Sequence, residues 1–154
     1  MRADIPMDGL SAAELLEDWA WLLPKPHELF ALNNFGDMFL RNEAGEIYFL
    51  SLATGLVNRL AESSAEFQQL SADQVDREKW FLLGLLNELE RAGMKISSGQ
   101  CFGFKKPPSL GGEIELSNIE VSPLYPYVSL MGQIHQQVNK LLPGTKITEV
   151  KIEQ

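Results

Sequence analysis

Three runs of hydrophobic residues in the first third of the chain have the length and spacing of β-strands. They are Leu29–Leu32, Met38–Leu40 and Ile47–Leu52. The segments between them, 33–37 and 42–45, are rich in Asn, Asp and Gly, which accept the backbone angles of tight turns. Strands joined by short turns pair antiparallel, so the pattern predicts a three-stranded meander.

Hydrophobic positions spaced by three and four residues predict helices on both sides of this meander. Ser11 and Glu14 have the spacing of a capping box, so a short helix is expected from there to about Trp19, before Pro24. One or two short helices are expected between residues 55 and 70.

The longest predicted helix covers residues 73–92 and ends at Gly93, a residue that favours the left-handed cap of a helix. It is apolar around most of its circumference, so it is expected to lie across the sheet as a central helix. A C-terminal helix is expected over residues 127–142.

Short apolar runs after the central helix predict further strands at 94–96, 101–104 and 113–121, and the alternating tail could add an edge strand within 143–154. Strands and helices are interspersed without a repeating βαβ unit. The predicted class is therefore α+β, with a mostly antiparallel, twisted sheet packed against the central and C-terminal helices. We expect a single domain over 1–154, with a lead-in over 1–28 and a core over 29–142.

The charge of the chain is concentrated in its first part. The 154 residues carry a net charge of −8, and residues 1–93 hold 16 acidic and 7 basic side chains. A negative surface repels phosphate backbones and attracts basic partners, so direct nucleic-acid binding is not expected. Solubility alone is an equally good explanation of this acidity.

The sequence also lacks the features of a membrane or secreted protein. Its apolar runs are far shorter than the about 20 residues that cross a bilayer, and its first residues mix charge with proline. Cys101 is the single cysteine, which fits a reducing compartment. We expect a cytoplasmic protein.

The chain has only two histidines and one cysteine, and we predict no enzyme, cofactor or metal. Cys101 and His135 could form a thiolate–imidazole pair, but isolated residues of these types are more often core residues. Glu113 and Glu115 would share one face of a strand, as a carboxylate pair or simply as a solvated face. The spacing of Cys and His fits no zinc motif.

Glycines and polar residues alternate in two later segments, and two interpretations are open. The glycines could let the backbone approach a small ligand while the polar residues bind it, in a small-ligand-binding or regulatory domain. Alternatively, the glycines serve turns and close packing, and the polar residues satisfy buried backbone groups. The residues concerned are Gly99, Gln100, Gly103, Phe104, Lys105, Gly111, Gly112, Glu113, Gly132, Gln133 and His135.

These segments also carry a family resemblance. Together with an upstream hairpin, they resemble the C-terminal domain of the bacterial type VI secretion DNase-immunity family, over about residues 29–142. The matching motifs are Phe35–Arg41, Gly45–Leu50, Gly99–Lys105, Pro108, Leu110–Glu113, Asn118 and Gly132–His135.

The resemblance implies a non-catalytic protein that neutralises a toxic DNase effector inside the producing cell. Family members place a GAD-like domain before this one, and the residues before Leu29 provide only a short lead-in. A DNase needs a basic cleft for its polyanion, so a basic protein partner is expected, and a weak homodimer is left open. The predicted partner-binding face consists of Asp8, Glu14, Glu17, Asp18, Asp37, Glu43 and Glu46.

Overall fold

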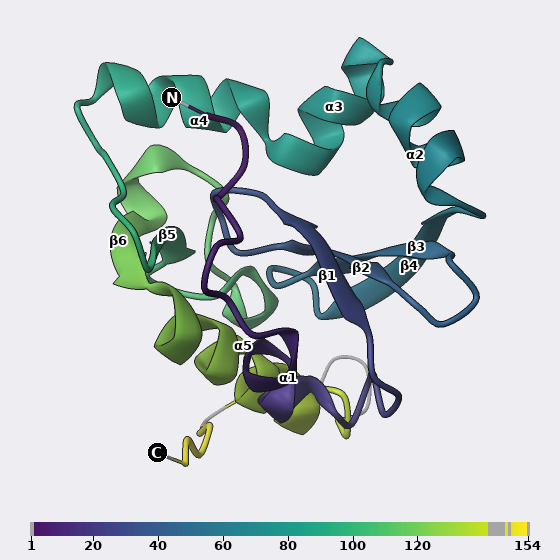
Figure 1. Ribbon diagram of the computed structural model, residues 1–154. Coiled ribbons are helices and arrows are strands. Elements are labelled where there is room, and N and C mark those ends of the chain that lie inside the picture. The colour runs from purple at the N-terminus through teal and green to yellow at the C-terminus, as the bar shows by residue number, and fades with distance from the viewer. Residues whose placement is uncertain (1, 142–146, 148, 154) are drawn as a thin grey trace.

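The computed structural model describes residues 2–141, 147 and 149–153. Its larger sheet has four antiparallel strands in the order β1-β2-β3-β4 (Figure 1). The predicted meander is confirmed as its first three strands. The strands are β1 (Glu28–Leu32), β2 (Met38–Arg41), β3 (Ile47–Ser51) and β4 (Leu56–Ala61).

Strand β4 corrects the prediction of a helix directly after Gly55. Leu56 to Ala61 pair with β3 from Ser51 back to Ile47, and β4 is an edge strand of the sheet. Hydrophobic residues at 56, 57, 60 and 61 fit either a helix or a half-exposed edge strand, so their spacing was ambiguous. The helix α2 (Ser64–Ser71) begins only after Ser63, whose hydroxyl accepts a hydrogen bond from the Glu66 N–H.

The predicted central helix is two helices, α3 (Gln74–Phe81) and α4 (Leu83–Arg91). They are separated by Leu82, which has a left-handed φ of 51°. Trp80 and Phe81 pack toward the larger sheet, whereas Leu86 and Leu89 pack in a second cluster with β5. One straight helix would cover only one of these surfaces, and this explains the break. Gly93 follows α4 with a φ of 79°, as predicted for the cap.

A second sheet consists of two antiparallel strands, β5 (Gln100–Phe104) and β6 (Ile119–Pro123). The strand predicted over 101–104 is confirmed as part of β5. No strand forms at 94–96, and the strand predicted over 113–121 begins only at Ile119. The preceding segment is a loop with two short 3₁₀ helices, η2 (Pro108–Leu110) and η3 (Leu116–Asn118).

The C-terminal helix α5 covers Leu124–Val138, so it begins and ends earlier than predicted. The edge strand predicted within 143–154 falls partly on residues outside those described. Residues 147, 149–153 of this tail have no strand structure.

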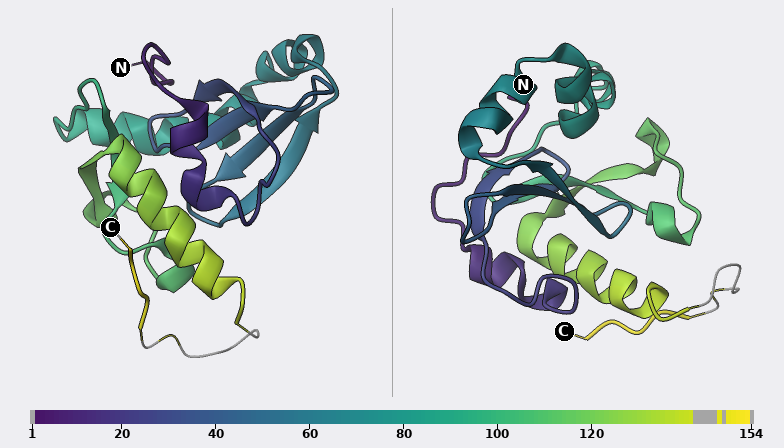
Figure 2. Two further views of the ribbon diagram at one scale, coloured as in Figure 1. Left: turned by 60° about the horizontal axis from the view of Figure 1, so that its bottom comes forward. Right: turned by 90° about the vertical axis from the view of Figure 1, so that its right-hand side faces the viewer.

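Two layers of helices enclose the larger sheet (Figure 2). Met38, Phe39 and Leu40 are completely buried although their side chains alternate between the two faces of β2. Phe39 packs with α2 and α3, and Met38 and Leu40 pack with α5. The N-terminal helices α1 (Ala12–Leu15) and η1 (Glu17–Trp19) extend the α5 layer. The fold is therefore α+β, as predicted.

Candidate partner-binding surface

The turn between β1 and β2 is a buried polar network centred on Asn33 and Asp37. The Asn33 side chain donates hydrogen bonds to the Asp37 carboxylate and to the Trp80 carbonyl, both at 2.9 Å. The other carboxylate oxygen of Asp37 accepts a 2.8 Å hydrogen bond from the Leu52 N–H. Burial raises the pKa of Asp37 to about 6, against the lowering effect of these hydrogen bonds.

Asp37 therefore does not belong to an exposed acidic face, which corrects that part of the predicted site. It is 6% exposed, and its carboxylate connects the turn to Leu52 directly after β3, while Asn33 connects the turn to α3. A carboxylate in a turn between strands is usually solvated, and no local pattern indicates that α3 packs against this turn.

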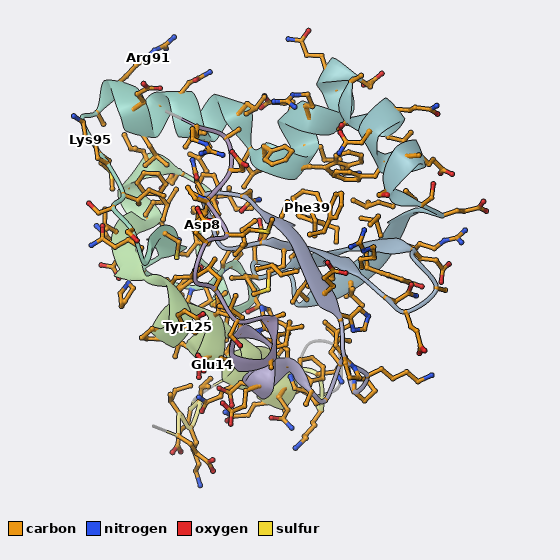
Figure 3. The ribbon with its side chains drawn as sticks, viewed as in Figure 1. Asp8, Glu14, Phe39, Arg91, Lys95 and Tyr125 are labelled. Carbon is orange, nitrogen blue, oxygen red and sulfur yellow. The ribbon has the colours of Figure 1, made fainter. Side chains whose placement is uncertain are left out.

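The other six predicted acidic residues lie in two parts of the molecule. Asp8, Glu14, Glu17 and Asp18 are in the N-terminal segment, where Figure 3 labels Asp8 and Glu14. The remaining two, Glu43 and Glu46, lie in the β2–β3 turn, between Arg41 and Ile47. Hydrogen bonds from Asn42 and then Arg59 lower the pKa of Glu46. The structure thus separates the predicted face into an N-terminal group and a turn group.

The N-terminal group includes one acidic groove. Glu17 and Asp18 line it together with Glu153 of the tail, Leu130 and Ile152, and its volume is about 640 Å³. Asp18 also accepts a hydrogen bond from the Ser129 hydroxyl. The sequence did not predict that Glu153 would join this group, because the tail reaches it through the side chains of α5.

The tail is held by two glutamines one helical turn apart on α5. Gln133 bonds both the N–H and the carbonyl of Glu153, and Gln137 bonds the same two groups of Lys151. Gln133 therefore pairs with the tail and not with the glycine-rich segment that accompanied it in the sequence motif.

The residues of the glycine-rich motifs do not converge on one pocket. Gly99 and Gln100 line a cleft of about 440 Å³ beside the N-terminal segment. The others lie elsewhere: Gly103 and Phe104 in β5, Lys105 just after it, Gly111, Gly112 and Glu113 in the loop before η3, and Gly132, Gln133 and His135 in α5.

Close packing explains why two of these positions are occupied by glycine. A Cβ on Gly132 would lie 2.6 Å from the Asp18 carbonyl oxygen, so the glycine lets η1 rest on α5. A Cβ on Gly112 would lie 1.8 Å from the Lys106 carbonyl oxygen, at the closure of the loop before β6. The Asn118 side chain closes the same loop, with bonds to the Lys106 N–H and to the Lys106 and Glu113 carbonyls.

The two candidate catalytic pairs are not assembled. His135 is buried, its Nε2 lies 2.7 Å from the Leu52 carbonyl oxygen, and burial lowers its pKa. Cys101 is buried in the core, where desolvation raises its pKa to about 12. Glu113 and Glu115 lie in a loop and not on one strand face, and Glu115 accepts a hydrogen bond from Ser117. The described part of the chain holds no His, Cys, Asp or Glu cluster suited to a metal ion.

A surface that the sequence analysis missed lies along β6 and the loop before it. Ile114 is 57% exposed, Leu116 36% and Val121 38%. The alternation of Glu113 to Ser117 indicated a strand with one buried apolar face, whereas the structure exposes these apolar side chains. Their exposure, which periodicity does not reveal, is what makes them a candidate contact surface.

Comparison with known proteins gives one family. Residues 61–135 match the family described as T6SS immunity protein Tdi1, C-terminal. This match, over just under half of the chain, confirms the predicted resemblance to a type VI secretion immunity family. It runs from the end of β4 to His135 in α5, within the predicted span of 29–142, and the upstream hairpin motifs lie outside it.

The solved structures add a likeness in fold. A crystal structure of Atu4351 from Agrobacterium tumefaciens resembles this chain with a TM-score of 0.59 and 18% identity, over 80% of this chain. The match spans 65% of that protein, slightly less than two thirds of its length. No curated protein matches the sequence. Among the described residues, no helix is long and apolar enough to span a bilayer.

Proposed function

We propose that this chain is an immunity protein that binds a type VI secretion effector and neutralises it in the cytoplasm of the producing cell. The observation that carries the proposal is the match of residues 61–135 to the Tdi1 immunity family. An immunity protein acts by binding a protein, so the partner of this chain is a protein effector.

The charge of the chain supports a basic effector of the DNase class. An enzyme that grips DNA presents a basic cleft, and the net charge of −8 favours rapid encounter with such a surface. The N-terminal carboxylates, with Glu17 and Asp18 at the acidic groove, provide a local concentration of that charge.

The buried chemistry supports binding without catalysis. Cys101 is a thiol held protonated in the core, and His135 is engaged with the Leu52 carbonyl. Cys101 serves packing in the core and His135 forms a hydrogen bond, so the two side chains have structural roles.

The test is protection in cells. To find the effector, the genes that neighbour this chain's gene are expressed one at a time in a bacterial host with and without the chain, while growth and chromosomal DNA integrity are followed. The expected result is DNA breakdown and death without the chain, and intact DNA and growth with it. A chain with Leu50→Asp in the core serves as the unfolded control.

Two outcomes would contradict parts of the proposal. If the host dies although the chain is present in it in soluble, folded form, the immunity function is refuted. Protection against an effector that leaves DNA intact would refute the DNase class and retain the immunity function.

A further inference from the structure

The outer edge of β6 is open in the described structure. β6 pairs with β5 alone, and Figure 1 shows it on the outer side of β5, away from the larger sheet. Lys105 N–H bonds the Asn118 carbonyl, and Leu124 N–H bonds the Gly99 carbonyl. In an antiparallel ladder these bonds recur at every second residue, so the N–H and C=O groups of Val121 point away from β5.

β6 and the loop before it carry exposed apolar side chains. Ile114, Leu116 and Val121 are three large apolar residues, all at least 36% exposed, within eight positions of the chain. Clustered exposure of this kind is typical of interaction sites, whereas isolated exposed residues are common everywhere.

The charge of the same segment is uniformly negative. Residues 111–123 hold three glutamates and no lysine or arginine, and Glu113, Glu115 and Glu120 are all exposed. The segment also lies inside the region that matches the immunity family, unlike the N-terminal carboxylates and the tail. An edge that combines free backbone groups, apolar side chains and glutamates is complementary to an extended basic segment.

We infer that β6 is the docking edge for the effector, and that an extended basic segment of the effector pairs with it as an added strand. This inference rests on the proposed function. The Val121 backbone supplies the main-chain hydrogen bonds, the apolar residues bury against the incoming strand, and the glutamates pair with its lysines or arginines. The N-terminal carboxylates then act at long range, on the rate of encounter.

The experiment uses the effector identified by the protection test, made catalytically inactive by substitution, and measures its binding to three forms of the full chain. They are the wild type, Val121→Lys at the β6 edge, and Val75→Lys on α3, where the native valine is 76% exposed. We expect Val121→Lys to weaken binding by about tenfold or more, through faster dissociation, and Val75→Lys to bind as the wild type does. Thermal unfolding of each form verifies folding.

A second variant and a second readout test the strand pairing itself. Val121→Pro removes the outward N–H and leaves the ladder to β5 intact, so it too is expected to weaken binding. The Val121 amide is expected to exchange hydrogen quickly in the free chain and slowly in the complex.

The outcomes separate the two proposals. Equal binding by the wild type and Val121→Lys would overturn the docking edge and leave the immunity function standing. Loss of self-association in Val121→Lys without loss of effector binding would also overturn it, because the edge would then serve a second copy of the chain. Absence of wild-type binding would refute the proposed function.

Discussion

The carboxylate of Asp37 accepts a 2.8 Å hydrogen bond from the backbone N–H of Leu52. The carbonyl of the same Leu52 is the partner of the His135 ring, at 2.7 Å. One residue directly after β3 thus connects a buried acid in the β1–β2 turn to a buried imidazole on α5. Both ionisable groups are removed from water, so the stability of the fold depends on pH through each of them, with opposite signs.

For Asp37, stability is expected to fall as pH rises. The pKa rises from 3.8 to about 6 on folding, so between these values the folded chain holds a proton that the unfolded chain has lost. Relative to Asp37→Asn, the free energy of unfolding should fall by roughly 3 kcal/mol between pH 3.5 and about 6.5. Urea unfolding of both proteins across this range measures it. If the free energies of unfolding of the wild type and Asp37→Asn differed by the same amount at every pH, Asp37 would not be a buried group that takes up a proton on folding.

For His135, stability is expected to fall as pH decreases. Burial lowers its pKa below 6.5, so the unfolded chain takes up the proton first and is favoured by acid. The free energy of unfolding of the wild type, compared with His135→Gln, should therefore decline below pH 6.5. Gln can still donate to the Leu52 carbonyl but does not titrate, which makes it the matched control. An identical pH profile for the two proteins would exclude this role.

Much of the fold follows from local sequence patterns, because those patterns reflect local physics. The turns with Asn, Asp and Gly define the β1–β3 meander, and Gly93 ends α4 where expected. The break at Leu82 could not be predicted in the same way. It arises because Trp80 and Leu86 pack into different clusters, and this is a tertiary cause without a local signal.

The candidate site shows the same division between local and tertiary information. The sequence shows the acidic bias of the first part of the chain. It does not show that α3 packs against the turn that contains Asp37, or that Glu153 lines the same groove as Glu17. The glycines of the motifs were predicted to allow close approach of the backbone, and Gly132 does so where it packs against the Asp18 carbonyl. The sequence pattern placed Ile114 in a half-buried strand, because alternation shows which residues share a face and not whether that face is covered.

Two glycines in helices should respond oppositely to alanine. At Gly132 a Cβ would meet the Asp18 carbonyl oxygen at 2.6 Å, so Gly132→Ala should cost about 1–3 kcal/mol of stability by forcing η1 away from α5. At Gly84, on the exposed side of α4, the nearest atom is an oxygen of the Glu78 carboxylate at 3.0 Å, the end of a long side chain that also accepts a hydrogen bond from the Gly84 N–H. Gly84→Ala should be neutral or stabilising by about 0.5–1 kcal/mol, because alanine is the better helix former. Thermal or urea unfolding of both variants checks this, and equal effects would contradict the close η1–α5 contact.

The thiol of Cys101 should be inert in the native protein. Its pKa of about 12, against an ordinary 9.0, lowers the thiolate fraction near pH 8 by about a thousandfold, and burial blocks access as well. An aromatic disulfide reagent should therefore react with the chain only after urea unfolding. Rapid labelling of the folded chain would show that Cys101 is accessible, and it would contradict the assignment of this thiol as an inert core residue.

Charge reversal should separate long-range attraction from docking. If the N-terminal carboxylates steer a basic effector, Glu14→Lys with Glu17→Lys should slow association at low salt, and this difference should shrink as salt screens the charges. Glu62→Lys with Glu66→Lys, near the start of α2, changes the net charge equally and is the matched control. Stopped-flow association with the inactive effector distinguishes the two pairs. Equal slowing by both would mean that net charge alone attracts the effector, whereas a larger effect at Glu14 and Glu17 locates the steering at the N-terminal segment.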